Sequence, residues 1–212
     1  MTLKIKDLSF RYFVDKPVIE KLSYTFMEGK ITAITGASGV GKSTLFQLIL
    51  GLIKPHEGSI TLGDALLSTP RYIVPTEHRG IGAVFQDFAL FPHLTVYDNL
   101  AFGLKGKKSI HHGDILSLAQ LFQIEDILSA YPYRLSGGQM QRVAIARSFA
   151  PCPSLILLDE PFSNIDETLT VSLRKNLKAY IHEKKMTVIV ITHDRQDTMD
   201  FADETFHLNY PL

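Results

Sequence analysis

The chain has 212 residues, 45% hydrophobic and 21% charged, which is enough for one core and too little for two ordinary domains. Its 22 Lys and Arg residues balance its 22 Asp and Glu residues, so it lacks the basic surplus that binds nucleic acid. The single Cys152 excludes an internal disulfide, and no apolar run is long enough for a signal peptide or a membrane span. We therefore expect a cytoplasmic protein without a nucleic-acid partner. Any membrane-crossing partner would be a separate chain.

The first part of the chain is predicted to consist mainly of strands. Alternating hydrophobicity predicts strands over 3–12 and 18–30, and a short β-branched run predicts a buried strand over 30–35. Helical spacing then begins at Lys42 and stops near Gly51. Two further strands are predicted over 58–64 and 80–86.

Helical signals dominate from Asp87 to about Ala150, with helices predicted over 95–104, 113–124 and 138–150. A strand over 154–161, a helix over about 168–183 and a strand over 186–194 follow. Strands that alternate with helices indicate a parallel sheet. We predict one α/β domain over 1–212, with a core formed by 1–86 and 151–212 and a helical subdomain over 87–150. The core should combine a parallel sheet with an antiparallel N-terminal β portion.

The segment "GASGVGKST" matches the Walker A phosphate-binding pattern and lies between a predicted strand and a predicted helix. Its glycines let backbone N–H groups turn toward a phosphate, Lys42 supplies a positive charge, and the Ser43 hydroxyl can bind Mg²⁺. This loop predicts binding of a purine nucleoside triphosphate with Mg²⁺. The nucleotide-binding candidates are Gly36, Ala37, Ser38, Gly39, Val40, Gly41, Lys42, Ser43 and Thr44.

Polar side chains follow three predicted strands at the end where parallel sheets place their sites. "LILLDEP" ends in Asp159, which we expect to hold Mg²⁺, and Glu160, which we expect to polarise the attacking water. "VIVITHD" ends at His193, able to donate to the γ-phosphate or the water. "AVFQ" ends at Gln86, whose amide could complete the Mg²⁺ shell. The predicted catalytic set has four residues: Lys42, Gln86, Glu160 and His193.

A second glycine turn, "LSGGQ", precedes the helix predicted over 138–150. Ser136 and Gln139 have the spacing of a capping box, and Gly137 and Gly138 leave the first helical amides uncovered. These residues predict a second anion-binding helix end, although an ordinary capped helix has the same pattern. Residue patterns alone leave open whether this end serves the same chain or a second copy.

Taken in order, "GASGVGKST", Gln86, "LSGGQ", "LILLDEP", "SNID" and "ITHD" resemble the motifs of the ATP-binding cassette (ABC) ATPases over essentially the whole chain. The stretch over 78–105 is similar to importer-type subunits. The resemblance implies that Tyr12 stacks on adenine, though a core tyrosine is the alternative. It also implies that Asp166 belongs to a loop exchanged between subunits and that the signature, Ser136 to Gln139, contacts ATP bound by the opposite subunit.

The family implies ATP and Mg²⁺ as cofactors and ATP hydrolysis as the activity. Expected partners are a second copy or a paralogous ATPase subunit in a head-to-tail sandwich, transmembrane permease subunits and a solute-binding protein, at the cytoplasmic face of the membrane. An exporter subunit, a soluble non-transport ABC ATPase and a nucleotide-gated regulatory module remain alternatives. The stretch after His193 predicts neither the further strand pair of many relatives nor a C-terminal regulatory domain.

Overall fold

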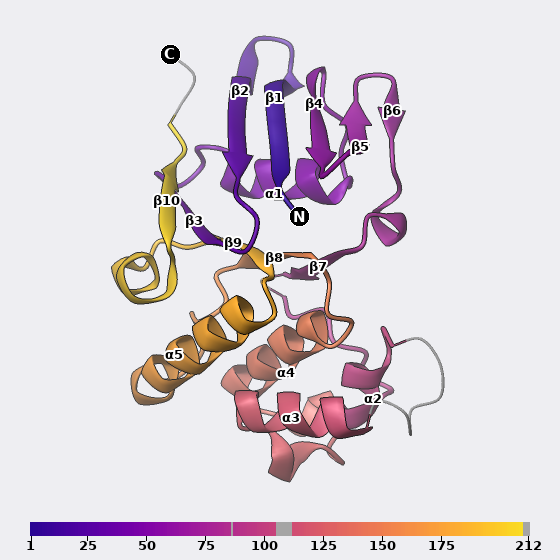
Figure 1. Ribbon diagram of the computed structural model, residues 1–212, viewed down its shortest axis with the longest axis vertical. Coiled ribbons are helices and arrows are strands. Elements are labelled where there is room, and N and C mark those ends of the chain that lie inside the picture. The colour runs from indigo at the N-terminus through magenta and orange to yellow at the C-terminus, as the bar shows by residue number, and fades with distance from the viewer. Residues whose placement is uncertain (86, 105–111, 210–212) are drawn as a thin grey trace.

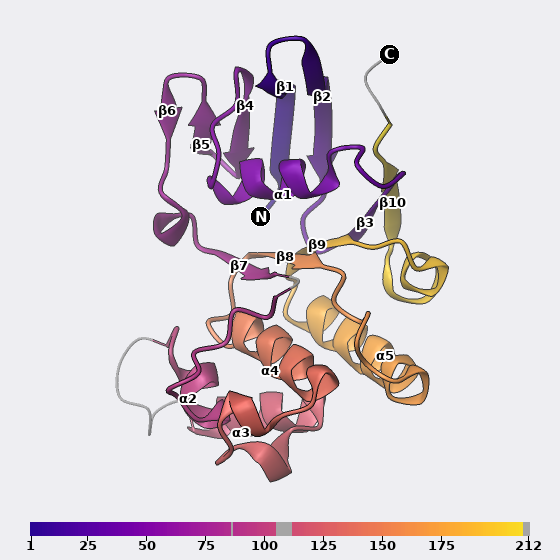
Figure 2. The ribbon, with the colours of Figure 1, turned by 180° about the vertical axis from the view of Figure 1, so that it is seen from behind.

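The computed structural model describes residues 1–85, 87–104 and 112–209, which form two sheets and a layer of helices (Figures 1 and 2). The predicted Mg²⁺ ligand Gln86 lies outside the described residues. The strands are β1 (Leu3–Phe13), β2 (Lys16–Phe26), β3 (Ile31–Thr35), β4 (Glu57–Leu62), β5 (Ala65–Thr69), β6 (Tyr72–Ile73), β7 (Ile81–Val84), β8 (Leu155–Asp159), β9 (Thr187–Ile191) and β10 (Glu204–His207). The α-helices are α1 (Lys42–Leu50), α2 (Val96–Ala101), α3 (His112–Phe122), α4 (Gly137–Phe149) and α5 (Glu167–Glu183).

One sheet is antiparallel, with strand order β2-β1-β4-β5-β6. Its long hairpin, β1 and β2, pairs Leu3 with Phe26 at one end and Phe13 with Lys16 at the other. The alternation that predicts these strands buries their apolar face, as at Leu3 and Ile5, against α1. The predicted antiparallel N-terminal portion is therefore present.

The second sheet is parallel, with order β10-β3-β9-β8-β7. Its central strands are buried on both faces, which explains why β8 and β9 are continuous apolar runs. Leu155 and Leu157 of β8 pack toward α1 and the antiparallel sheet. Ile156 and Leu158 pack on the opposite face, against the helices. Helix α1 thus lies between the two sheets, and α2 to α5 cover the other face of the parallel sheet (Figure 1).

A buried arginine joins α1 to the antiparallel sheet. The Arg79 guanidinium donates to the Ile49 carbonyl at 2.6 Å, near the end of α1, and to Ser68 Oγ of β5 at 2.7 Å. Burial lowers the pKa of Arg79 to about 10. The carbonyls at the C-terminal end of α1 carry partial negative charge, which favours a cation at this position. This contact fixes the far end of the helix whose N-terminus begins at the phosphate loop.

The predicted elements are present with shifted ends, and three strands were not predicted. β5 and β6 are short strands joined by a Pro70–Arg71 turn, so they lack a long alternating run. β10 forms from the stretch after His193, where no further strand pair was expected. It is a single edge strand with alternating exposure that pairs with β3 from Glu204 to His207, and no sequence pattern predicted it. A π-helical turn, η5 (Asp197–Phe201), precedes it.

Candidate functional site

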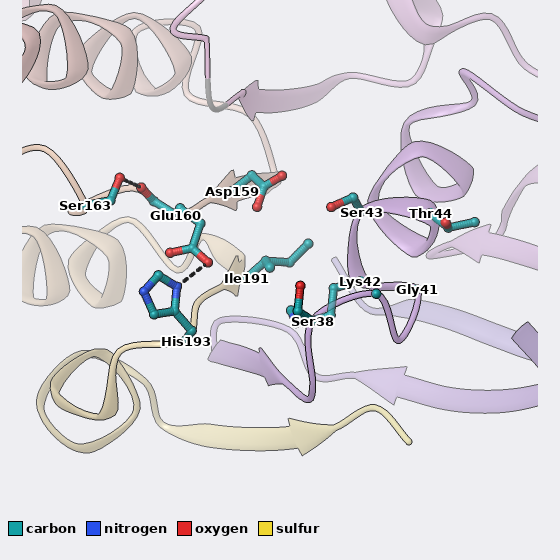
Figure 3. Close-up of a pocket in the computed structure, with 11 residues that line it drawn as sticks. Ser38, Gly41, Lys42, Ser43, Thr44, Asp159, Glu160, Ser163, Ile191 and His193 are labelled. Carbon is teal, nitrogen blue, oxygen red and sulfur yellow. Dashed lines mark hydrogen bonds and ion pairs between the residues drawn. The ribbon is translucent and has the colours of Figure 1, made fainter. Parts of the chain in front are cut away.

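A cleft of about 380 Å³ opens where β3, β8 and β9 end, because parallel strands bring their carboxyl ends to one edge of the sheet. Figure 3 shows that phosphate-loop residues form one side and the acid pair and histidine the other. Residues far apart in sequence therefore meet as predicted. The lining residues are Ser38, Gly39, Gly41, Lys42, Ser43, Thr44, Asp159, Glu160, Ser163, Ile191 and His193.

The loop after β3 takes its shape from glycines with positive φ. Gly36 has φ 145°, and a Cβ there would lie 2.4 Å from the Leu208 carbonyl oxygen, which follows β10. Gly41 has φ 110°, and a Cβ would lie 3.0 Å from Val18 Cγ1. Gly41 is also the N-cap of α1 and provides no side-chain cap. The first amides of α1 therefore have no side-chain acceptor from the cap, as an anion-binding helix end requires.

The Lys42 ammonium lies over this loop. Its Nζ donates to the Gly36 carbonyl at 2.7 Å and to the Ala37 carbonyl at 3.0 Å. These bonds fix the charge at the mouth of the loop, within the same cleft as Asp159 and Glu160. The position is the one at which the sequence pattern predicts contact with phosphate oxygens.

Tyr12 lies on β1 beside the helix that follows the loop. Its hydroxyl lies 3.3 Å from Thr44 Oγ1 and donates to Gln47 Oε1 at 3.3 Å, while its ring packs edge-on against Phe10. The side chain is 55% exposed, so it is not a core tyrosine. An exposed ring next to the phosphate loop is available for stacking.

The acid at the end of β8 and the histidine after β9 form a close pair. Glu160 has φ 51°, in the left-handed region, so the chain bends sharply after Asp159 and both carboxylates line one cleft. Glu160 Oε1 lies 2.7 Å from His193 Nδ1 (Figure 3). The hydrogen bond that His193 donates to Glu160, and then the negative charge of Glu160, raise the pKa of His193. The Glu160 side chain is 19% exposed and that of His193 is 77% exposed.

Asp159 is more enclosed, and its pKa is raised first by burial and then by repulsion from Glu160, with Lys42 acting in the opposite direction. Figure 3 shows Asp159 and Ser43 facing each other across the cleft. A carboxylate and a hydroxyl are oxygen donors, the kind that Mg²⁺ accepts together with nucleotide phosphates. Among the described residues, no group of three or more His, Cys, Asp or Glu side chains could hold a metal ion alone. This donor set fits an ion that arrives with a triphosphate.

The second glycine turn forms the predicted capping box. Gln139 N–H donates to Ser136 Oγ at 3.3 Å, and the Ser136 N–H donates to Gln139 Oε1 at 2.9 Å, so α4 begins at this turn. A Cβ on Gly137 would meet nothing within 4 Å. None of the four signature residues lines the cleft that contains Lys42. The two glycine turns therefore belong to separate surfaces of this chain.

Asp166 is the N-cap of α5, where its Oδ1 accepts from Leu169 N–H at 2.9 Å.

Two residues in contact with the site were not predicted. Ser163 lines the cleft, and its Oγ donates to the Glu160 carbonyl at 3.0 Å. Gln141 also donates to that carbonyl, at 2.8 Å. Ser163 lies three residues after Glu160, a one-turn spacing that could have indicated it, whereas no local spacing links Gln141 to Glu160.

No helix in the described part of the chain is long and apolar enough to cross a bilayer.

Comparisons with known proteins agree with this geometry. A family model described as ABC transporter matches residues 19–163. The Fe(3+) ions import ATP-binding protein FbpC of Haemophilus influenzae (strain 86-028NP) is 40% identical over 205 residues, which cover 95% of this chain and 58% of that protein. This chain thus spans less than two thirds of the length of that relative.

Two solved structures of the bacterial ABC transporter cassette MJ0796 superpose on the fold. A dimeric structure has a TM-score of 0.86 at 31% identity, covering 97% of this chain and 94% of that chain. A dimeric post-hydrolysis structure bound to ADP and Pi has a TM-score of 0.82 at 31% identity, covering 98% and 94%.

Proposed function

This chain belongs to the ABC transporter family, and from that membership we propose that it binds and hydrolyses ATP to drive a separate membrane permease. The observation that carries this proposal is the single cleft that unites the phosphate loop, Asp159, Glu160 and His193. The post-hydrolysis neighbour bound to ADP and Pi supports the same nucleotide chemistry. The match with an Fe(3+) import protein favours an importer and makes ferric iron the first solute to test.

In the proposed ATP complex, the amides of the loop from Gly36 to Ser43 cradle the β-phosphate, and Lys42 exchanges its loop carbonyls for β- and γ-phosphate oxygens. Tyr12, exposed beside Thr44, stacks on the adenine. Together these contacts bind the triphosphate and the base through different parts of the chain.

We propose that Ser43 and Asp159 hold Mg²⁺ together with the ATP phosphates, and that Gln86, outside the described residues, completes the set. When bound, the ion neutralises charge that develops on the phosphate oxygens. Burial raises the pKa of Asp159, so the ion and Lys42 would also stabilise its carboxylate.

Glu160 is the proposed general base. Its carboxylate accepts the proton of a water as that water attacks the γ-phosphate in line, the bond to the β-phosphate oxygen breaks, and ADP leaves. His193 holds the Glu160 carboxylate through Nδ1 at 2.7 Å, which leaves Nε2 for the γ-phosphate. The two carboxylates of the cleft thus have different proposed roles: Asp159 is a metal ligand and Glu160 is the base.

The signature from Ser136 to Gln139 is proposed to bind the γ-phosphate side of ATP held by a second copy, since it does not line the cleft of its own chain. The dimeric cassette neighbour supports a head-to-tail pair. ATP then favours the closed dimer, because only that state adds the second helix end. Asp166 would lie in the loop exchanged between the two copies, and a paralogous subunit could replace the second copy.

The remaining partners follow from importer-type relatives. We propose that permease subunits bind the segment after Gln86, that a solute-binding protein completes the complex, and that this chain lies at the cytoplasmic face of the membrane. We further propose that 87–150 acts as a helical subdomain attached to the core of 1–86 and 151–212.

The test is the Glu160→Gln variant, with the exposed Glu183→Gln on α5 as a matched control. Glu160→Gln removes the base and keeps the side-chain size, so it should still bind ATP, release no phosphate and elute as an ATP-dependent dimer by size-exclusion chromatography. Glu183→Gln should behave like wild type. Normal phosphate release by Glu160→Gln would contradict the assignment of the base.

A further inference from the structure

Helix α4, which begins at the signature, carries a buried amide that the proposed reaction does not use. Gln141 is 2% exposed and lies two residues after the capping Gln139. A buried amide must find partners for its donors and acceptor, so its contacts show what it holds.

The partners of Gln141 all lie in the segment that follows β8. Nε2 donates to the Glu160 carbonyl oxygen at 2.8 Å. Oε1 accepts from the Asn164 N–H at 3.1 Å and from Asn164 Nδ2 at 3.0 Å. One side chain therefore binds the backbone at both ends of the turn from Glu160 to Asn164.

This turn needs external support, because Glu160 adopts a left-handed φ of 51°, which is unfavourable for a residue with a side chain. The Glu160 N–H donates to the Ile191 carbonyl at 2.9 Å, which holds the turn to β9. The Glu160 carbonyl accepts from Ser163 Oγ at 3.0 Å within the turn itself. Gln141 thus provides the side-chain hydrogen bonds between the turn and α4.

The first turn of α4 also touches the same segment directly. A Cβ on Gly138 would lie 2.8 Å from the Asn164 carbonyl oxygen, so the two backbones are in close contact. A displacement of the start of α4 would therefore press on Asn164 and pull on Gln141 together. The start of α4 and the Glu160 turn are therefore packed directly against each other.

We propose that Gln141 is a positioning residue that connects the signature helix to the backbone of Glu160, so that the placement of α4 determines the placement of the base. The catalytic consequence of this claim rests on the proposed function. In the proposed dimer, the start of α4 contacts the partner's ATP while Glu160 acts on ATP bound by its own chain. Gln141 would then relay engagement of one ATP site to hydrolysis at the other.

A purely structural role for Gln141 makes a different prediction. A buried amide that only fills space and satisfies its own bonds would affect stability, and ATP hydrolysis would fall only as far as the folded fraction falls. A positioning role would change the environment of the Glu160 carboxylate in folded protein. His193 reports that environment, because its closest charged contact is Glu160 Oε1.

The experiment compares Gln141→Met, Gln141→Asn and the matched control Arg142→Met in the full chain. Gln141→Met removes both sets of bonds at similar length. Gln141→Asn keeps a neutral amide but is one methylene shorter, which withdraws its donor from the Glu160 carbonyl and provides a second neutral variant should the methionine variant fail to fold. Arg142, the next residue on α4, donates to the Phe122 carbonyl at 2.9 Å and so binds α4 to α3 instead. Thermal unfolding, ATP affinity, kcat and an NMR titration of His193 are measured for each.

We expect both Gln141 variants to lower the pKa of His193 toward its ordinary value and to lower kcat about ten- to a hundredfold, with ATP affinity within about twofold of wild type. Arg142→Met should lose stability and leave the His193 titration and the kcat of folded protein unchanged. The proposal is overturned if the Gln141 variants titrate like wild type at His193, or if Arg142→Met changes kcat and titration equally. If wild type releases no phosphate, the proposed function fails, and the His193 titration still decides the positioning role.

Discussion

The Glu160–His193 pair is the residue-scale feature on which the chemistry depends. The hydrogen bond to Glu160 raises the pKa of His193 above its ordinary value of 6.5. A raised histidine pKa in the folded state gives stability that is fully present below the unfolded pKa and is lost as the pH rises through the folded pKa. Because His193 is largely exposed, solvent screens this contribution.

We therefore expect Glu160→Gln to lower the His193 pKa and to reduce stability only on the acidic side. Chemical unfolding of wild type and Glu160→Gln should differ at about pH 6 and converge as the pH rises through the folded-state pKa of His193 and that histidine loses its charge. A difference that grew toward high pH would contradict the pairing.

The positions of site residues could be predicted from the sequence where one short segment contains both the functional side chain and the loop or strand end that positions it. Lys42 and Ser43 follow a glycine loop, and Asp159 and Glu160 end an apolar strand, so their places in one cleft could be foreseen. Gln141 could not, because its contact with Glu160 depends on how α4 packs against the turn after β8. Their roles in hydrolysis stay predictions.

At the scale of elements, η5 and α5 hold the segment around His193. Arg174 of α5 lies 2.6 Å from Asp197 Oδ1 and 2.7 Å from Asp194 Oδ2. Asp197 Oδ2 in turn accepts from Thr192 Oγ1 at 2.5 Å. The Arg174 and Asp197 side chains are 6% and 2% exposed, so this is a buried ion pair next to the histidine.

Asp197→Ala leaves the buried Arg174 charge with the more exposed Asp194 as its remaining carboxylate, so it should lower the free energy of unfolding by about 3 kcal/mol. Asp200→Ala, at an exposed position of the same turn, should change it by no more than about 0.5 kcal/mol. Urea denaturation of both variants checks this. Equal values for the two would show that the pair contributes little.

Element boundaries were predictable where helical periodicity was long, as in α5, and not where strands were short or at an edge. β10 has only four residues and alternates in exposure, so its pairing with β3 depends on tertiary contacts rather than on an apolar run. Its neighbour Leu208 nevertheless abuts Gly36, so an unpredicted element supports the phosphate loop.

At the scale of the whole molecule, the two glycine turns do not meet within the chain. Lys42 lines the cleft, whereas Ser136 to Gln139 do not. Local sequence predicted the capped helix end, and only the family resemblance assigned it to the opposite subunit. The helical subdomain over 87–150 also stays a prediction, since residues of α2, α3 and α4 share one hydrophobic cluster with β8 and β9.

The central claim, that each ATP is hydrolysed between two copies, is tested most directly by mixing two inactive variants. Lys42→Ala disables the phosphate loop and keeps the signature, while Ser136→Arg disables the signature and keeps the phosphate loop. In a head-to-tail pair, one of the two sites of a mixed dimer combines the intact halves. Phosphate release should therefore be absent in each variant alone and restored in the mixture. A mixture no more active than its separate components, with both variants folded and Ser136→Arg still binding ATP, would contradict the shared site.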